Sequence, residues 1–338
     1  MNKFTISGSP HVHANLSVKK IMYLVVIALM PAFLVSVYFF GLSALRTMAI
    51  SVAACLLVEW LIQKYLIKGP STIGDGSAVV TGVLLAFNVP SNIPWWILVI
   101  GAIVAIGIGK MSFGGLGQNP FNPALVGRVF MLVSFPTQMT LWPIPKPIFG
   151  GDVVTDAITG PTALSILKEN VKAGTSVEQI LSSGKLPAFA DQLLGNQGGS
   201  MGEMCALALI LGGLFLIMCK VIDWQTPATI IATVFVFAGI CHLINPEAYI
   251  QPIFHILNGG LLLGAFFMAT DMATSPMTIK GKVIFAIGIG VITMIIRLWG
   301  AYPEGMSFAI LIMNALTPLI NKGFKTKIFG TKKVESSK

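Results

Sequence analysis

Charged side chains are scarce in this sequence. They make up 10% of its 338 residues, whereas hydrophobic residues make up 55% and the mean hydropathy is +0.83. Soluble domains carry far more charge, usually about 25% of their residues. The composition therefore excludes an ordinary soluble protein and indicates a polytopic membrane protein.

Histidine and cysteine are also sparse, and neither follows the spacing of a metal site. Two of the four histidines, His242 and His255, lie near the ends of apolar stretches. Each is interpreted either as a buried, hydrogen-bonded histidine or as a ligand or proton carrier. No zinc, iron–sulfur or disulfide framework is predicted from the cysteines. These are Cys55, Cys205, Cys219 and Cys241.

The net charge of +9 is not concentrated in a continuous stripe of basic residues. Lysine and arginine lie at the ends of apolar stretches and are not interleaved with aromatic residues, so nucleic-acid binding is not predicted. The glycines of residues 113–123 do not follow the Gly-x-Gly-x-x-Gly spacing and no strand precedes them, which excludes a dinucleotide fingerprint. The positive charge is better explained by membrane topology.

Apolar stretches that could form all or part of a membrane-spanning helix occur throughout the chain. Measured against a span of about 20 residues, the sequence contains ten candidate membrane segments. Several are short, such as 78–89, and are expected to be broken helices shielded by their neighbours. The segments are 21–40, 45–66, 78–89, 95–109, 123–135, 203–219, 227–243, 253–270, 283–299 and 305–320.

If the chain crosses the membrane ten times, most of its lysines outside the long loop lie on one side of the membrane. Both termini then lie on one side, and the positive-inside rule makes that side cytoplasmic. The short outside loops keep little more than Arg46 and Arg297. The inside set is Lys3, Lys19, Lys20, Lys64, Lys68, Lys110, Lys220, Lys280, Lys282, Lys322, Lys325, Lys327, Lys332, Lys333 and Lys338.

This topology divides the chain into five parts. The one long polar excursion is extracytoplasmic, and residues 1–20 have no cleavable signal. The predicted parts are a cytoplasmic segment 1–20, a first membrane half 21–135, an extracytoplasmic loop 136–202, a second membrane half 203–320 and a basic cytoplasmic tail 321–338.

The two membrane halves resemble each other. Residues 81–87 (TGVLLAF) are echoed by residues 259–266 (GGLLLGAF), and a polar, proline-containing break follows each, at 88–94 and 270–276. Five spans per half give the halves opposite orientations. The predicted fold is an all-α membrane protein of about ten transmembrane helices in two inverted five-helix repeats; chance similarity between glycine- and leucine-rich helices is the alternative.

Polar residues at membrane depth mark candidate sites, because an acid or amide there must face a cavity, a partner or a ligand. Nearby Gly and Pro free backbone groups for such contacts. Interfacial turns with capping acids are the alternative interpretation. The candidates for an ion path are Asp75, Asn119, Asn122, Asp271 and Glu304.

Five motifs, in this order, resemble the D-type component of the Rnf electron-transport complex, and they are similar to the B-type component of the sodium-translocating NADH:quinone reductase. The likeness covers nearly the whole chain. The motifs are 75–78 (DGSA), 114–128 from GGLGQNPFNP to GR, 156–162 (DAITGPT), 269–276 (ATDMATSP) and 302–305 (YPEG).

The resemblance implies that FMN is joined through its phosphate to a threonine hydroxyl, within the pattern Asp-x-x-Ser/Thr-Gly-Ala-Ser/Thr. The matching acceptor is Thr162, and Asp156, Thr159 and Gly160 are the other matching positions. Pro161 stands where alanine is usual, and it favours an extended Gly160. The mature chain would be both a flavoprotein and a phosphoprotein. The resemblance also allows a second flavin, riboflavin, bound without a covalent link.

By the same resemblance, the chain is expected to be a membrane subunit of an ion-translocating ferredoxin:NAD oxidoreductase complex that moves sodium ions or protons. Its partners would include a second flavoprotein, an iron–sulfur subunit and, for maturation, a flavin transferase. The chain has no nicotinamide or cluster motif, so it cannot complete the reaction alone. Alternatives are a flavin-free solute transporter or channel with inverted repeats, and a structural membrane scaffold.

Overall fold

The computed structural model describes residues 17–68, 71–145, 159–184 and 186–325. Helix dominates this part of the chain. Its sheet is a two-stranded antiparallel pair, β1 (Trp142–Pro143) with β2 (Thr159–Gly160), in which Trp142 faces Gly160. The architecture is therefore that of an all-α protein, as the sequence predicts.

The described first half of the chain contains five main helices. Two of them, α2 and α4, continue directly into π-helical segments, and two of the connections contain short 3-10 turns. The elements are α1 (Val18–Phe40), α2 (Leu42–Leu61) with η1 (Ile62–Ile67), η2 (Ile73–Asp75), α3 (Ser77–Phe87), α4 (Trp95–Ala102) with η3 (Ile103–Ile108), η4 (Met111–Phe113) and α5 (Pro123–Ser134).

Short helices follow, and then a second set of long ones. The excursion contains α6 (Pro136–Thr140), α7 (Ala163–Lys172), α8 (Val177–Ser182) and α9 (Phe189–Leu194). The second half contains α10 (Ala206–Met218), α11 (Gln225–Ile244), α12 (Pro252–Leu257), α13 (Leu261–Leu263) with η5 (Gly264–Met268), α14 (Ile279–Trp299) and α15 (Met306–Gly323). Each of the ten predicted segments overlaps helical structure.

Five helices are long and apolar enough to cross a membrane: Val18–Phe40, Leu42–Ile67, Trp95–Phe113, Gln225–Ile244 and Ile279–Trp299. Three shorter apolar helices, α3, α5 and α10, accompany them. An 11-residue helix such as α3 is only about 16 Å long, half of a hydrocarbon core of about 30 Å. Most residues of α3 are buried, so neighbouring helices shield it, as predicted for segment 78–89.

Close helix packing is made possible by glycine at the crossing of α2 and α3. A Cβ on Gly82 would lie 2.7 Å from the Val52 Cα. At the same crossing the Ser51 hydroxyl donates to the Gly82 carbonyl at 2.7 Å. The absence of a side chain lets the two backbones meet, which seats the short α3 against the long α2.

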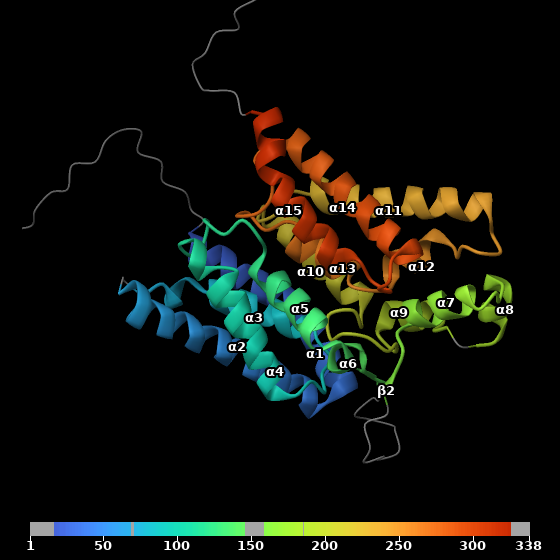
Figure 1. Cartoon of the computed structure of the whole chain (residues 1–338), viewed down its shortest axis with the longest axis horizontal. Helices are drawn as coiled ribbons and strands as arrows, with labels where there is room; N and C mark the ends of the chain where they lie inside the picture. The colour runs from blue at the N-terminus through green and yellow to red at the C-terminus, as the bar shows by residue number, and fades with distance from the viewer. Residues whose placement is uncertain (1–16, 69–70, 146–158, 185, 326–338) are drawn as a thin grey trace, which may run out of the picture.

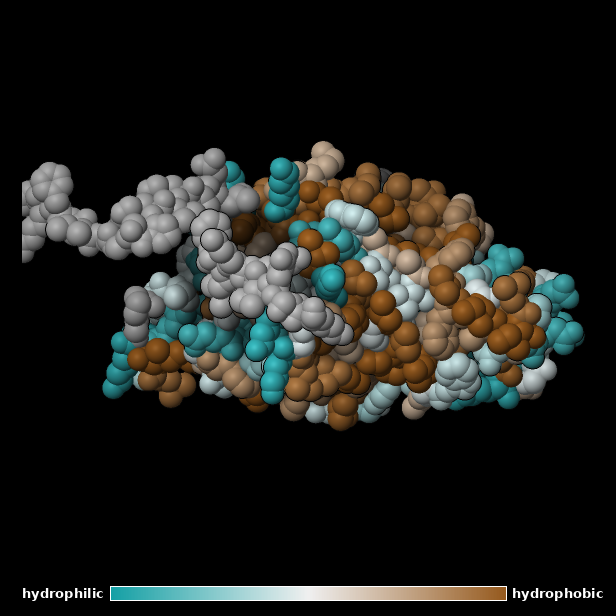
Figure 2. All heavy atoms as spheres, turned by 90° about the horizontal axis from the view of Figure 1, so that it is seen from above, coloured by the Kyte–Doolittle hydropathy of each residue, from teal (hydrophilic) through white to brown (hydrophobic). Residues whose placement is uncertain are grey.

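The two halves lie on opposite sides of the molecule in Figure 1, with α1–α4 in blue and teal and α11, α14 and α15 in orange and red. The helices α7, α8 and α9 gather at one end. Figure 2 shows an apolar surface over the middle of the molecule, with hydrophilic residues at both ends, one of them the end that carries α7 and α8. This distribution is that of a multi-pass membrane protein.

Candidate functional site

Thr162 stands at the start of helix α7 and caps it. Its backbone is extended (φ −70°, ψ 159°), and its Oγ1 accepts a hydrogen bond from the Ser165 amide at 3.3 Å. The Ser165 hydroxyl lies 3.0 Å from the same oxygen. The predicted companions Thr159 and Gly160 form β2, directly before this cap. Asp156 lies outside the described residues.

A cavity of about 680 Å³ opens beside Thr162, and we call it the Thr162 cavity. Membrane-half residues and excursion residues form its wall together. Its polar side chains include Arg128, Thr140, Thr162, Ser165, Gln197, Glu203, Asn258 and Glu304, and its apolar wall includes Leu132, Met139, Trp142 and Tyr302. Glu203, the first residue of the predicted segment 203–219, lies in this wall.

Arg128, in α5, is the central cation of the Thr162 cavity. It donates to Glu304 at 2.8 Å, to the Asn88 side-chain oxygen at 2.9 Å and to the Ser307 hydroxyl. The Arg128–Glu304 pair is largely buried. A charge-assisted bond of this kind fixes both side chains, because breaking it would leave a charge without a partner.

Glu304 and Arg297 together hold the turn between α12 and α13. Glu304 accepts from the Gly260 amide, and Arg297 donates to the carbonyls of His255 and Asn258. Gly259 has a φ of +73°, which favours glycine. The topology argument placed Arg297 in an outside loop; it is instead buried in the last turn of α14.

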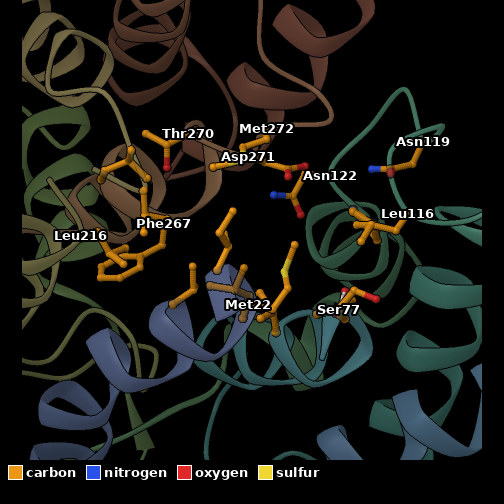
Figure 3. Close-up of a pocket in the computed structure, with 18 of the residues that line it drawn as sticks. Met22, Ser77, Leu116, Asn119, Asn122, Leu216, Phe267, Thr270, Asp271 and Met272 are labelled. Atoms are coloured by element: carbon orange, nitrogen blue, oxygen red, sulfur yellow. Dashed lines mark hydrogen bonds between the residues drawn. The ribbon is translucent and has the colours of Figure 1, made fainter. Parts of the chain in front are cut away.

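Three of the predicted ion-path residues surround a second cavity of about 780 Å³, the Asp271 cavity, at the end away from α7. They are Asn119, Asn122 and Asp271. In Figure 3, Asn122 and Asp271 approach this cavity from one side, and Met22 and Ser77 from the other.

The remaining two candidates lie elsewhere. Asp75 does not line the Asp271 cavity in the described structure but accepts from the Ser77 amide (2.7 Å) and hydroxyl (2.6 Å) at the start of α3. Glu304 belongs to the Thr162 cavity. Asn119, Asn122 and Asp271 therefore line one cavity. Asp75 is bonded to Ser77, which also lines that cavity, and Glu304 lies in the other cavity.

Asn122 and Asp271 owe their positions to backbone capping. The Asn122 side chain accepts from the Ala124 amide at 3.1 Å and donates to the Met268 carbonyl at 3.2 Å. Asp271 accepts from the Ala273 amide (3.4 Å) and the Thr274 hydroxyl (3.2 Å). Asn119 bonds to the backbone of its own loop. The helix-breaking motifs therefore supply local partners for side chains that also line a cavity.

A chain of polar contacts connects the two cavities. Arg128 bonds to Asn88, and the Asn88 amide donates to the Leu84 carbonyl (2.6 Å) and lies 3.7 Å from the Met268 sulfur. The Met268 carbonyl in turn accepts from Asn122. Along α5, Pro123 lines one cavity and Arg128 the other, a rise of about 7 Å.

A buried ion pair that sequence reasoning missed borders the Asp271 cavity. The Lys110 ammonium lies 2.7 Å from a Glu59 carboxylate oxygen and 2.6 Å from the Ser77 hydroxyl. Lys110 is 2% exposed and Glu59 is fully buried. The sequence-based topology counted Lys110 among the loop lysines; it does lie in a turn, between η3 and η4, but it is buried. Glu59 can be recognised in the sequence as an acid inside the second segment, but its partner, Lys110, lies 51 positions further along the chain.

A family model described as the NQR2, RnfD, RnfE family matches residues 5–330. The chain belongs to this family. The predicted resemblance to the Rnf component is thereby confirmed.

Curated relatives of this family match the chain from end to end. The D-type component of the sodium-translocating ferredoxin:NAD⁺ oxidoreductase complex of Acetobacterium woodii is 48% identical, covering 98% of the chain and 96% of the relative. The proton-translocating counterpart of Clostridium ljungdahlii is 45% identical, covering 98% of each. The D-type component of the ion-translocating oxidoreductase complex of Escherichia coli is 36% identical, covering 98% and 99%. These relatives are subunits of oxidoreductase complexes.

Proposed function

We propose that this chain is the D-type membrane subunit of an ion-translocating ferredoxin:NAD oxidoreductase complex. We further propose that it relays electrons through FMN joined to Thr162 by a phosphoester. The observation that carries the proposal is the position of Thr162, whose hydroxyl caps a helix and lines a cavity with both polar and apolar walls.

The start of α7 suits a phosphate. The first amides of a helix have no partner within it, and they attract anions together with the helix dipole. Thr162 Oγ1 already lies against the Ser165 amide, so an ester at this oxygen would keep its phosphate among backbone donors. Thr162, Ser165 and the first amides of α7 are the groups that would hold it.

The rest of the Thr162 cavity suits a flat, partly polar ring. Trp142, Tyr302 and Met139 supply apolar walls. The Gln197 side-chain oxygen is buried without a hydrogen-bond partner among the described residues, so it can accept from a ligand. A bound flavin would supply one- and two-electron transfer, and the apolar wall would exclude water from it.

For the membrane topology we propose ten crossings, with both termini in the cytoplasm and residues 136–202 outside. Helices overlap all ten segments, and the excursion helices lie at the opposite end from the start of α1. The broken segments α3 and α13–η5 occupy matching positions in the two halves, which supports inverted five-helix repeats. The domain boundaries 1–20, 21–135, 136–202, 203–320 and 321–338 follow from this topology.

The Asp271 cavity is our candidate for the second flavin and for coupling to ion movement. It combines Lys110, Asn122 and Asp271 with an apolar wall, and polar contacts join it to the Thr162 cavity. The ion is sodium or a proton. The two relatives named for different ions are 48% and 45% identical to the chain, so overall similarity does not choose between them.

The expected partners are a second flavoprotein and an iron–sulfur subunit, which would exchange electrons with this chain. A flavin transferase would be needed to form the phosphoester. The proposed location is the bacterial inner membrane, where the excursion would meet that transferase outside.

Replacing Thr162 with alanine tests the proposal. Chain purified from a host that makes the transferase should fluoresce as a flavin band after denaturing electrophoresis, and phosphodiesterase should lower its intact mass by the attached group. Thr162→Ala should abolish the band. Thr140→Ala, which removes another hydroxyl from the same cavity, is the matched control and should keep it.

A colourless wild-type chain of unmodified mass would reject the electron relay and favour the flavin-free transporter. A band that survives in Thr162→Ala would move the attachment to another residue.

A further inference from the structure

A third cavity, of about 500 Å³, lies on the other side of α7 from Thr162, and we call it the Arg297 cavity. It is enclosed by α7, α12, the segment before α12 and the end of α14. Its polar wall is formed by Lys168, Lys172, Tyr249, His255 and Arg297.

Two buried nitrogen atoms of this wall have no hydrogen-bond partner in the described structure. They are Arg297 Nε and His255 Nδ1, and their residues are only 4% and 3% exposed. The other Arg297 nitrogens are used, because they donate to the carbonyls of His255 and Asn258. A buried guanidinium N–H without an acceptor costs free energy. An oxygen atom of a ligand would therefore serve as the missing hydrogen-bond acceptor for Arg297 Nε.

Positive charge accumulates in the same wall. The Lys168 ammonium donates to the carbonyls of Ile296 (3.0 Å) and Tyr302 (2.7 Å), which leaves one of its three protons free. None of the described residues that line the cavity is acidic. Burial and the neighbouring charge of Lys172 lower the pKa of Lys168. An anion in the cavity would offset both effects.

The charges of Glu203 and Glu304 act on Arg297, but neither acid accepts a hydrogen bond from Arg297 Nε. Glu304 accepts from Arg128 and from the Gly260 amide. It shares its charge with Arg128, so Lys168 and Lys172 remain without a counter-ion in the described structure.

The remaining wall is apolar and opens where the protein surface is apolar. Leu164, Leu167, Val171 and Leu298 line the cavity. Trp299, which directly follows Leu298 in the chain, is 59% exposed, and Ile244, the last residue of α11, is 77% exposed. Exposed tryptophan beside aliphatic residues is typical of the membrane interface. A ligand with an anionic head and a hydrocarbon part fits both halves of this wall.

We propose that the Arg297 cavity binds the phosphate head group of an anionic phospholipid, with Arg297, Lys168 and Lys172 around the phosphate and the acyl chains along α7 and α14. Inorganic phosphate offers the same charge but no hydrocarbon. The lipid is favoured because the cavity wall also contains Leu164, Leu167, Val171 and Leu298, which offer nothing to a free anion.

Native mass spectrometry of the purified full-length chain tests the proposal. The chain is titrated with dioleoyl phosphatidylglycerol or with dioleoyl phosphatidylcholine, which is neutral overall. Phosphatidylglycerol should occupy the tightest site and raise the thermal unfolding temperature more. Lys168→Gln should weaken this binding about tenfold, the effect of one charge-assisted contact.

Lys172→Gln provides a second variant, because Lys172 is exposed at the cavity mouth and its loss does not threaten folding. It should also weaken phosphatidylglycerol binding. Lys322→Gln, an exposed lysine at the end of α15, is the matched control and should leave binding unchanged.

Three results would overturn the proposal. The first is equal binding of the two lipids to the wild-type chain. The second is unchanged phosphatidylglycerol affinity in both cavity variants. The third is stabilisation by inorganic phosphate alone that matches the lipid, which would identify a free-anion site.

Discussion

At the scale of single residues, burying a charged side chain costs free energy, and the buried Lys110 and Arg128 are stabilised by hydrogen-bond and ion-pair partners. Lys110 is held by Glu59 and Ser77, and Arg128 by Glu304, Asn88 and Ser307. Each group combines residues from different helices. Losing one member would leave another buried without compensation.

The Lys110–Glu59 pair predicts strong coupling between two substitutions. Glu59→Gln should destabilise the chain by about 3–5 kcal/mol, because it leaves a buried ammonium without its counter-ion. The double substitution Glu59→Gln with Lys110→Met should cost much less than the sum of the two single changes. Thermal unfolding of the three variants in one detergent checks this, and additive losses would contradict the ion pair.

At the scale of helices, short elements are stabilised by close contact with long ones. Helix α3 is buried over most of its length and approaches α2 through Gly82. Helix α7 is positioned by Thr162 at its first turn and by Lys168, whose ammonium donates to the carbonyl of Ile296 in α14 and to that of Tyr302 in the α14–α15 connection. The excursion is therefore attached to the membrane half next to the Thr162 cavity.

Gly82→Ala should destabilise the crossing of α2 and α3. Its Cβ would lie 2.7 Å from the Val52 Cα, a backbone atom that cannot rotate away, and such overpacking costs about 1–3 kcal/mol. Gly107→Ala is the matched control, since its Cβ would meet Ile62 at an ordinary 3.6 Å. Thermal unfolding compares them, and equal midpoints would show that the crossing can adjust.

At the scale of the whole molecule, the two cavities occupy opposite ends of a shared set of helices. Helix α5 contributes to both, with Pro123 at one cavity and Arg128 at the other. Under the proposed function, the two cavities would hold the two redox groups, and the helices between them would exclude lipid and water. That arrangement suits electron relay better than a scaffold without a ligand.

The proposed topology predicts opposite labelling of two exposed positions. Glu178, in α8, and Lys322, near the end of α15, are both exposed. In a background where the partly exposed Cys219 and Cys241 are serine, Glu178→Cys should react with a membrane-impermeant maleimide in intact spheroplasts. Lys322→Cys should react only after permeabilisation. The reverse pattern would invert the topology.

Much of this architecture could be predicted because its causes are local. Apolar run length favours helix whatever surrounds it, so each of the ten segments overlaps helical structure. The breaks at Asn122 and Asp271 could also be located, because Gly and Pro act on their own backbone. Thr162 was predicted as the flavin attachment site from its family motif, and the flavin itself remains a prediction.

Other features depend on residues far apart in the chain. Lys110 resembled a loop lysine and Arg297 a loop arginine, yet both are buried. Nothing beside them in the sequence identifies Glu59 or the carbonyls of His255 and Asn258 as their partners.

The sequence by itself determined the class of the protein, its helical segments and its family, because hydrophobicity and motif order act along the chain. Only the tertiary structure decided which polar groups share a cavity. It brought Thr162 to Arg128 and Glu304 in one cavity and Lys168 to Arg297 in another. The physical reason is that buried charge is stabilised by whichever opposite charge or dipole folding brings near, at any separation in sequence.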